Sequence, residues 1–93
     1  MEQQAQKIAE LLKLLANKNR LLILCALTHD KQNVGEIHRH LSDITASALS
    51  QHLNQLKTAG ILASEKQGMN VLYWIEDKRV LSLMKTLKNN YCN

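Results

Sequence analysis

The sequence predicts a mainly α-helical fold that carries one β-hairpin. Apolar residues recur at helical spacing over most of the 93 residues. Residues 61–66 and 69–75 are instead typical of two short strands around the turn Gln67-Gly68. Proline is absent and only 3 glycines occur, so no flexible linker interrupts the chain. This length and composition predict one domain over residues 1–93.

Two helices are predicted before residue 30. The first, over 3–16, has an apolar stripe opposite a polar face: Ile8, Leu11, Leu12 and Leu15 against Gln6, Lys7, Glu10 and Lys13. Asn17 ends it and can cap the second helix, over 18–29. The second is apolar nearly all round between Leu21 and Leu27, which predicts the central buried helix. Cys25 within it is expected to be a small buried hydrophobe.

A helix-turn-helix is predicted over residues 33–60. Asn33 and Glu36 have the spacing of a capping box for a helix over 34–41. A tight turn at 42–44 leads into a second helix over 44–59, which Gly60 ends as a C′ glycine. The second helix has one apolar stripe: Leu49, Leu53 and Leu56.

The opposite face of that second helix is rich in hydroxyl and amide side chains and has one charge, Lys57. Such groups bond base edges and phosphate oxygens in a DNA major groove. The residues expected to contact DNA here are Thr45, Ala46, Ser47, Ser50, Gln51, His52, Asn54, Gln55 and Lys57. The alternative is an ordinary αα-hairpin that touches no nucleic acid.

The hairpin directly after this helix is predicted to be a wing. Its tip residues Lys66, Gln67 and Asn70 can reach phosphate or the minor groove, unless the hairpin only closes the core. Together with the two helices it predicts a winged helix-turn-helix. Asp77 can cap a last helix over 78–91.

The first and last helices each carry an apolar stripe that so small a domain cannot fully cover. We therefore expect a homodimer through the first and last helices. A twofold dimer would place two recognition helices about 34 Å apart, so the expected partner is a palindromic double-stranded operator.

Composition limits the other classes of function. The net charge of +4 is compatible with a polyanionic partner, and 3% aromatic residues without Phe disfavour stacking on single strands. The longest apolar run is too short to span a membrane and the N-terminus does not resemble a signal peptide. We expect a cytoplasmic protein with no membrane partner, whose cysteines rest as thiols. An enzyme is disfavoured because no glycine-rich phosphate loop or nucleophile elbow occurs.

Four stretches resemble the ArsR/SmtB family of bacterial winged-helix transcriptional repressors: LLANKNRLLIL at 14–24, VGEI at 34–37, SALSQHL at 47–53 and GIL at 60–62. The resemblance covers nearly the whole chain. It implies a homodimer that binds operator DNA and releases it on sensing an inducer.

The metal sites of that family lack their ligands here. The positions of its thiolate pair correspond to Asn33 and Gly35, which offer no thiolate. The last helix contains no His, and Asp77 stands alone there. The four histidines lack the paired spacing of a zinc site and are expected at the surface or as caps: His29, His38, His40 and His52. No metal and no cofactor are expected.

Cys25 and the Tyr91-Cys92 end resemble the dithiol branch of the family, the BigR/SqrR/YgaV/HlyU-like regulators. That resemblance implies that Cys25 and Cys92 form a redox-sensing pair, with reactive sulfur species or an oxidant as the inducer. A direct disulfide needs Cα atoms roughly 4.4–6.8 Å apart. Two alternatives stay open: a DNA-binding repressor with inert cysteines and a different inducer or none, and a protein-interaction module.

Overall fold

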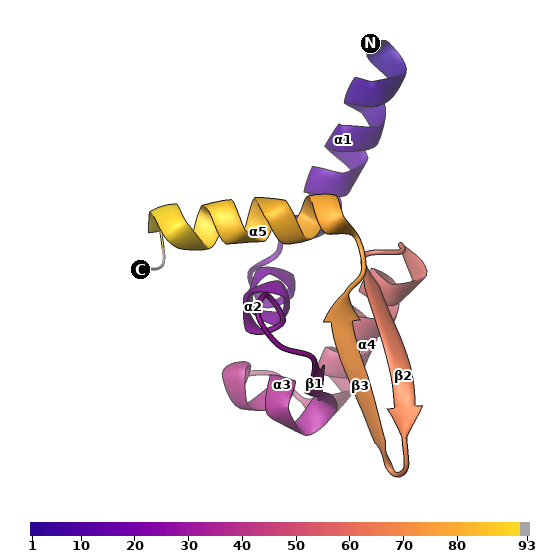
Figure 1. The fold of residues 1–93 in the computed structure, drawn as a ribbon, viewed down its shortest axis with the longest axis vertical. Coiled ribbons are helices and arrows are strands. Elements are labelled where there is room, and N and C mark those ends of the chain that lie inside the picture. Colours follow the sequence, from indigo (N-terminus) through magenta and orange to yellow (C-terminus); the bar gives the residue numbers. More distant parts are fainter. Residues whose placement is uncertain (92–93) are drawn as a thin grey trace.

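The computed structural model describes residues 1–91. Five helices and three strands follow one another along this part of the chain: α1 (Glu2–Leu15), α2 (Lys18–Ala26), β1 (Gln32–Asn33), α3 (Val34–His40), α4 (Ala46–Thr58), β2 (Leu62–Gln67), β3 (Asn70–Ile75) and α5 (Lys78–Tyr91) (Figure 1). The predicted fold of helices with one hairpin is confirmed.

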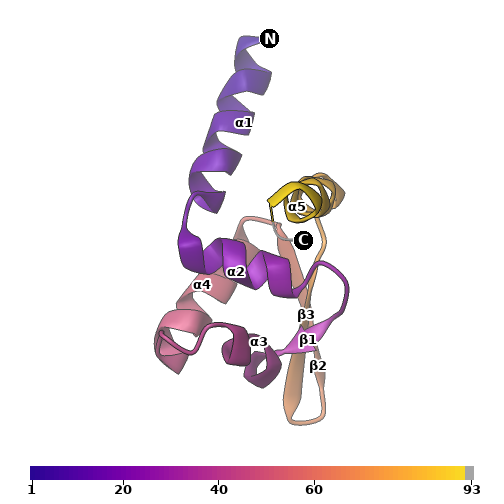
Figure 2. The same cartoon turned by 90° about the vertical axis from the view of Figure 1, so that its left-hand side faces the viewer.

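Helix α1 extends away from the rest of the molecule in both views (Figures 1 and 2). Leu15, in its last turn, is buried, and Leu11 and Leu14 pack against the core. Ile8 and Leu12, nearer its free end, are 56% and 49% exposed. The helix is therefore attached to the core at one end only, and part of its predicted apolar stripe lies in solvent.

Helix α2 crosses the centre of the molecule beneath α5 (Figure 1). Asn17 caps it, as predicted, by accepting bonds from Asn19 and Arg20 N–H. The prediction that the helix reaches residue 29 is wrong, because it ends at Ala26. Side chains beyond the helix bond its last carbonyls: the Gln32 amide donates to Ala26 O at 2.7 Å. Such bonds satisfy carbonyls that a helix end leaves without partners.

The two helices of the helix-turn-helix are α3 and α4. The predicted capping box is confirmed, since Asn33 and Glu36 exchange bonds of 2.9 Å. The second helix begins at Ala46 rather than at residue 44, because Thr45 Oγ1 accepts the Ala48 N–H at 3.0 Å and caps it. The turn is therefore longer than predicted.

The sheet has three antiparallel strands in the order β1-β3-β2. Strand β2 is shifted by one residue from the prediction and β3 begins one residue later than predicted. The turn is therefore Gly68-Met69 rather than Gln67-Gly68, and Gln67 pairs with Asn70 next to it. Gly68 and Gly60 both have positive φ, 62° and 81°, which glycine adopts without the steric cost of a side chain. Strand β1 was not predicted; it has two residues and pairs with β3 through Gln32 and Tyr73.

One apolar core joins these elements: Leu15, Ile23, Leu24, Leu27, Ile37, Leu41, Leu49, Leu53, Leu56, Ile61, Leu62, Ile75, Val80 and Met84. It includes the whole predicted stripe of α4. Asp77 caps α5 by accepting the Arg79 N–H at 2.9 Å, as predicted. Half of α2 is less buried than predicted, with Leu21, Leu22 and Cys25 only partly covered.

Candidate nucleic-acid interface and thiol site

The polar face of α4 lies in solvent. Eight of the nine residues predicted to contact DNA on this helix and its cap are exposed: Thr45, Ala46, Ser47, Ser50, Gln51, Asn54, Gln55 and Lys57. Leu49, Leu53 and Leu56 fix the helix from its opposite side and are at most 1% exposed. A rigidly seated helix thus presents a continuous row of hydrogen-bonding side chains to solvent.

The β2–β3 hairpin supplies the second part of the surface. Its tip points away from the free end of α1 in both views (Figures 1 and 2). Lys66, Gln67 and Asn70 are all exposed there. Backbone pairing with β3 holds β2 along its length, so the tip residues have a fixed place relative to α4, which contacts β2.

Two of the predicted DNA-contacting residues also bond within the protein, through Arg20 of α2. Arg20 Nε donates to His52 Nδ1 at 3.3 Å, and Arg20 Nη2 donates to Gln55 Oε1. Arg20 Nη1 donates to Leu14 O at 3.0 Å, at the end of α1. Arg20 therefore links α1, α2 and α4. Sequence reasoning missed this because the partners on α4 are 32 and 35 residues away.

Burial lowers the pKa of His52 below its ordinary value of 6.5, and repulsion by Arg20 lowers it further. Because its pKa is lowered, the His52 ring is mainly neutral at pH 7. Its half-buried position corrects the expectation of a surface or capping residue. The same correction applies to His38, which is half-buried with its Nε2 2.8 Å from Ile44 O. His29 and His40 are exposed, as expected.

Cys25 lies in an apolar groove of about 600 Å³ between α2 and α5. The groove is lined by Ala16, Asn17, Lys18, Leu21, Leu22, Cys25, Met84, Leu87, Lys88 and Tyr91. Cys25 is half-buried, and Lys88 Nζ donates to its carbonyl oxygen at 3.4 Å. The other predicted sensing residue, Cys92, lies outside the described residues. Tyr91, which precedes it in the sequence, lines the same groove as Cys25.

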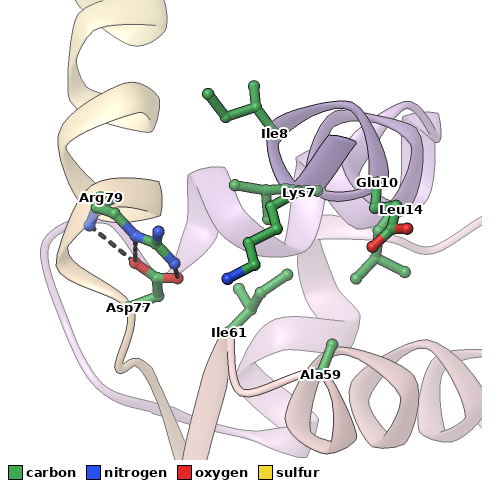
Figure 3. Close-up of a pocket in the computed structure, with 9 residues that line it drawn as sticks. Lys7, Ile8, Glu10, Leu14, Ala59, Ile61, Asp77 and Arg79 are labelled. Atoms are coloured by element: carbon green, nitrogen blue, oxygen red, sulfur yellow. Dashed lines mark hydrogen bonds and ion pairs between the residues drawn. The ribbon is translucent and has the colours of Figure 1, made fainter. Parts of the chain in front are cut away.

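A second hollow, of about 320 Å³, lies where α1, the end of α4 and the start of α5 meet (Figure 3). Lys7 of α1 points across it toward Ile61, and Arg79 forms an ion pair of 2.9 Å with Asp77 at its edge (Figure 3). That ion pair, and two backbone bonds to the carboxylate, lower the pKa of Asp77. Ile8, Leu11 and Leu14 of α1 line this hollow, so it includes part of the apolar stripe of α1.

Within residues 1–91, no group of three or more His, Cys, Asp or Glu side chains converges as a metal site would. In the same part of the chain, no helix is both long and apolar enough to cross a membrane.

Comparison with known proteins identifies the family and the fold. The sequence pattern described as bacterial regulatory protein, arsR family, matches residues 17–64, which include α2, α3, α4 and the start of β2. This chain belongs to the ArsR family. The HTH-type transcriptional regulator YgaV of Escherichia coli (strain K12) is 37% identical over 93 residues, which cover 99% of this chain and 93% of YgaV.

Two solved structures match this chain over almost their full length. Reduced HlyU from Vibrio cholerae N16961 superposes with a TM-score of 0.93 and 36% identity, covering 100% of this chain and 97% of that one. BigR from Xylella fastidiosa gives 0.88 and 29%, covering 100% and 94%. The predicted winged helix-turn-helix and the predicted family are confirmed. The chain is a DNA-binding transcriptional regulator and not an enzyme.

Proposed function

We propose that this ArsR-family regulator is a dimeric repressor that binds a palindromic operator and leaves it when Cys25 and Cys92 are oxidised or bridged by sulfur. The observation that carries the DNA-binding part is the exposed hydroxyl and amide face of α4, a helix that contacts strand β2 of the hairpin. Hydroxyl and amide groups read base edges, and Lys57 and Lys66 can neutralise phosphates. BigR, a transcriptional repressor, has the same fold and supports repression as the outcome.

The dimer is supported by apolar surface that the described residues leave uncovered. Ile8 and Leu12 of α1 are about half exposed, and Tyr91 at the end of α5 is 82% exposed. The groove between α2 and α5 adds further apolar surface. Large apolar side chains in water favour association, and a twofold contact would cover the same surface on both subunits.

The thiol switch is supported by the place of Cys25. It lies in the groove that Tyr91 also lines. A bridge from Cys25 to Cys92, the residue that follows Tyr91 in the sequence, would therefore join α2 to the end of α5.

The chemistry of this switch needs no cofactor. A cysteine thiolate attacks the outer sulfur of a persulfide R–S–SH, which gives a cysteine persulfide and the thiol R–SH. The second cysteine then attacks the inner sulfur, which forms the disulfide and releases hydrogen sulfide.

The coupling from thiols to DNA needs only a modest free energy. A shift of α2 relative to α5 moves the elements that hold α4. A difference of about 1–3 kcal/mol between the two states lowers operator affinity by about 5- to 150-fold.

The test starts from a duplex selected with reduced full-length protein out of a random pool. Its affinity is then measured by fluorescence anisotropy before and after treatment with an organic persulfide, with thiol modification confirmed by mass spectrometry. We expect the treated protein to bind at least fivefold more weakly, and Cys25→Ser and Cys92→Ser to keep their affinity. Failure of reduced protein to select any duplex would refute DNA binding. Unchanged affinity after confirmed modification would refute the switch and leave a repressor with inert cysteines.

A further inference from the structure

We propose that Arg20 is a positioning residue for DNA recognition, because it bonds the acceptor atoms of Gln55 and His52 and so turns the N–H donors of both side chains toward other partners. The inference rests on the proposed binding of duplex DNA by α4. It adds a residue outside the helix-turn-helix to the recognition surface and states which DNA atoms two of its side chains can bind.

The geometry of Arg20 commits its donors to three different places. Nε donates to His52 Nδ1 at 3.3 Å, Nη1 donates to Leu14 O at 3.0 Å, and Nη2 donates to Gln55 Oε1. Arg20 itself is half-buried, so its planar group is held between α2 and α4 rather than moving freely in water. The rigid shape of a guanidinium allows these bonds at the same time, which the single ammonium of lysine would not reproduce.

The chemistry of a guanidinium then fixes the orientation of both partners. Because it contains donors and no acceptor, the Gln55 carboxamide must turn its oxygen toward Arg20 and keep its NH₂ for other partners. By the same reasoning His52 Nδ1 must be unprotonated, so the proton of the neutral ring is on Nε2. The bonds to Arg20 therefore fix the tautomer of His52 and the rotation of the Gln55 amide.

This restriction determines what Gln55 can recognise. A free glutamine pairs with adenine by donating to N7 and accepting from N6. With one lone pair of its oxygen bonded to Arg20, Gln55 can form that pair only through the second lone pair, whereas its NH₂ donors stay unrestricted. The groups that Gln55 and His52 turn toward the duplex are therefore N–H donors, which bind acceptor atoms. These are purine N7, guanine O6 and thymine O4 in the major groove, or the oxygens of the phosphate backbone.

The test uses the duplex selected by wild-type protein and four variants: Arg20→Met, Gln55→Ala, their combination, and Arg79→Met. Arg79 is an exposed arginine at the start of α5, so its variant loses the same charge without touching α4. We expect Arg20→Met to bind about tenfold more weakly than Arg79→Met, which corresponds to the loss of one positioned contact. In the Gln55→Ala background, Arg20→Met should cost clearly less, because the side chain that it positions is absent.

Two further measurements separate positioning from a merely structural role. Nitrogen-15 NMR of the histidines should show His52 protonated on Nε2 and bare on Nδ1 in wild-type protein, with that preference lost in Arg20→Met. Duplexes with 7-deazapurines or with neutral methylphosphonate linkages, placed one position at a time, remove base or phosphate acceptors separately. One of the two series should lower the affinity of wild-type protein more than it lowers the affinity of Gln55→Ala. That series shows whether the acceptor atom belongs to a base or to the phosphate backbone.

Equal affinities of Arg20→Met and Arg79→Met, or a protonated Nδ1 on His52 of the wild type, would overturn the inference while DNA binding stands. Wild-type protein that binds no duplex would instead overturn the proposed function. If Arg20→Met does not fold, as judged by circular dichroism, Arg20→Lys takes its place. The wild-type tautomer and the Gln55→Ala comparison on modified duplexes then decide the question.

Discussion

Thr45 is a residue at which the stability of α4 and the proposed contact of α4 with DNA can be measured together. Its Oγ1 accepts the Ala48 N–H at 3.0 Å and is the side-chain cap of α4. Thr45→Ala leaves that N–H to water, and loss of such a cap costs roughly 0.5–2 kcal/mol. Because Thr45 is exposed and water replaces part of the bond, we expect the free energy of unfolding to fall by about 1 kcal/mol. The midpoint temperature should fall by about 4–8 °C.

The assay is thermal unfolding followed by circular dichroism at one fixed protein concentration, alongside binding of the selected duplex. Thr58→Ala is the matched control, since Thr58 is an exposed threonine at the other end of α4 and caps nothing. Thr45→Asn should restore stability, because asparagine caps helices at least as well as threonine. We also expect Thr45→Ala to weaken duplex binding, because Ala46 and Ser47 lie in the turn that the cap holds. Equal midpoints for Thr45→Ala and Thr58→Ala would refute the reasoning.

Three further predictions follow from the core, the histidine and the hairpin. Leu53 is 1% exposed, so Leu53→Ala should lower the free energy of unfolding by about 2–5 kcal/mol, whereas Met69→Ala, at a position 99% exposed, should leave the urea midpoint unchanged. The lowered pKa of His52 means that the unfolded chain binds a proton first as pH falls, so the stability this residue contributes is complete above about pH 6.5 and is lost as pH falls through the lowered pKa. His52→Gln should therefore flatten the stability profile between pH 7 and pH 5 measured by urea unfolding, and an unaltered profile would argue against a lowered pKa of His52. Lys66→Ala should weaken binding to all duplexes alike and reduce the slope of log affinity against log salt by about 0.9, whereas loss at one sequence alone would make Lys66 a base reader.

Local sequence signals predicted most of the fold. Caps at Asn17, Asn33 and Asp77 act over two or three residues, so their positions could be predicted without the structure. The end of α2 was not predicted, because apolar residues continue to Leu27 in the sequence and no local signal marks Ala26, whose carbonyl accepts a bond from the Gln32 amide. Strand β1 was not predicted either, because two residues are too few to show an alternation of apolar and polar side chains. Its pairing with β3 joins residues about 40 positions apart in the chain.

In the candidate site, too, the features set by local sequence were predicted and those set by contacts between distant residues were not. The polar face of α4 was predicted because helical spacing separates Gln51 and Asn54 from the buried leucines, and each of these positions is where the pattern puts it. The bonds of Arg20 to α4 were not predicted, because no local pattern relates residues so far apart in the chain. The groove at Cys25 was also missed, since helix 18–29 was expected to be buried on all sides.

The most direct test of DNA reading by α4 is the affinity of wild-type protein and Gln51→Ala for every single-base-pair variant of the selected duplex. Gln51 is exposed on the face of α4 opposite its buried leucines. We predict that the wild type loses about 1–3 kcal/mol at one base pair and that Gln51→Ala abolishes that preference while other positions keep theirs. Wild-type protein that binds all variants and an unrelated duplex equally would contradict the account.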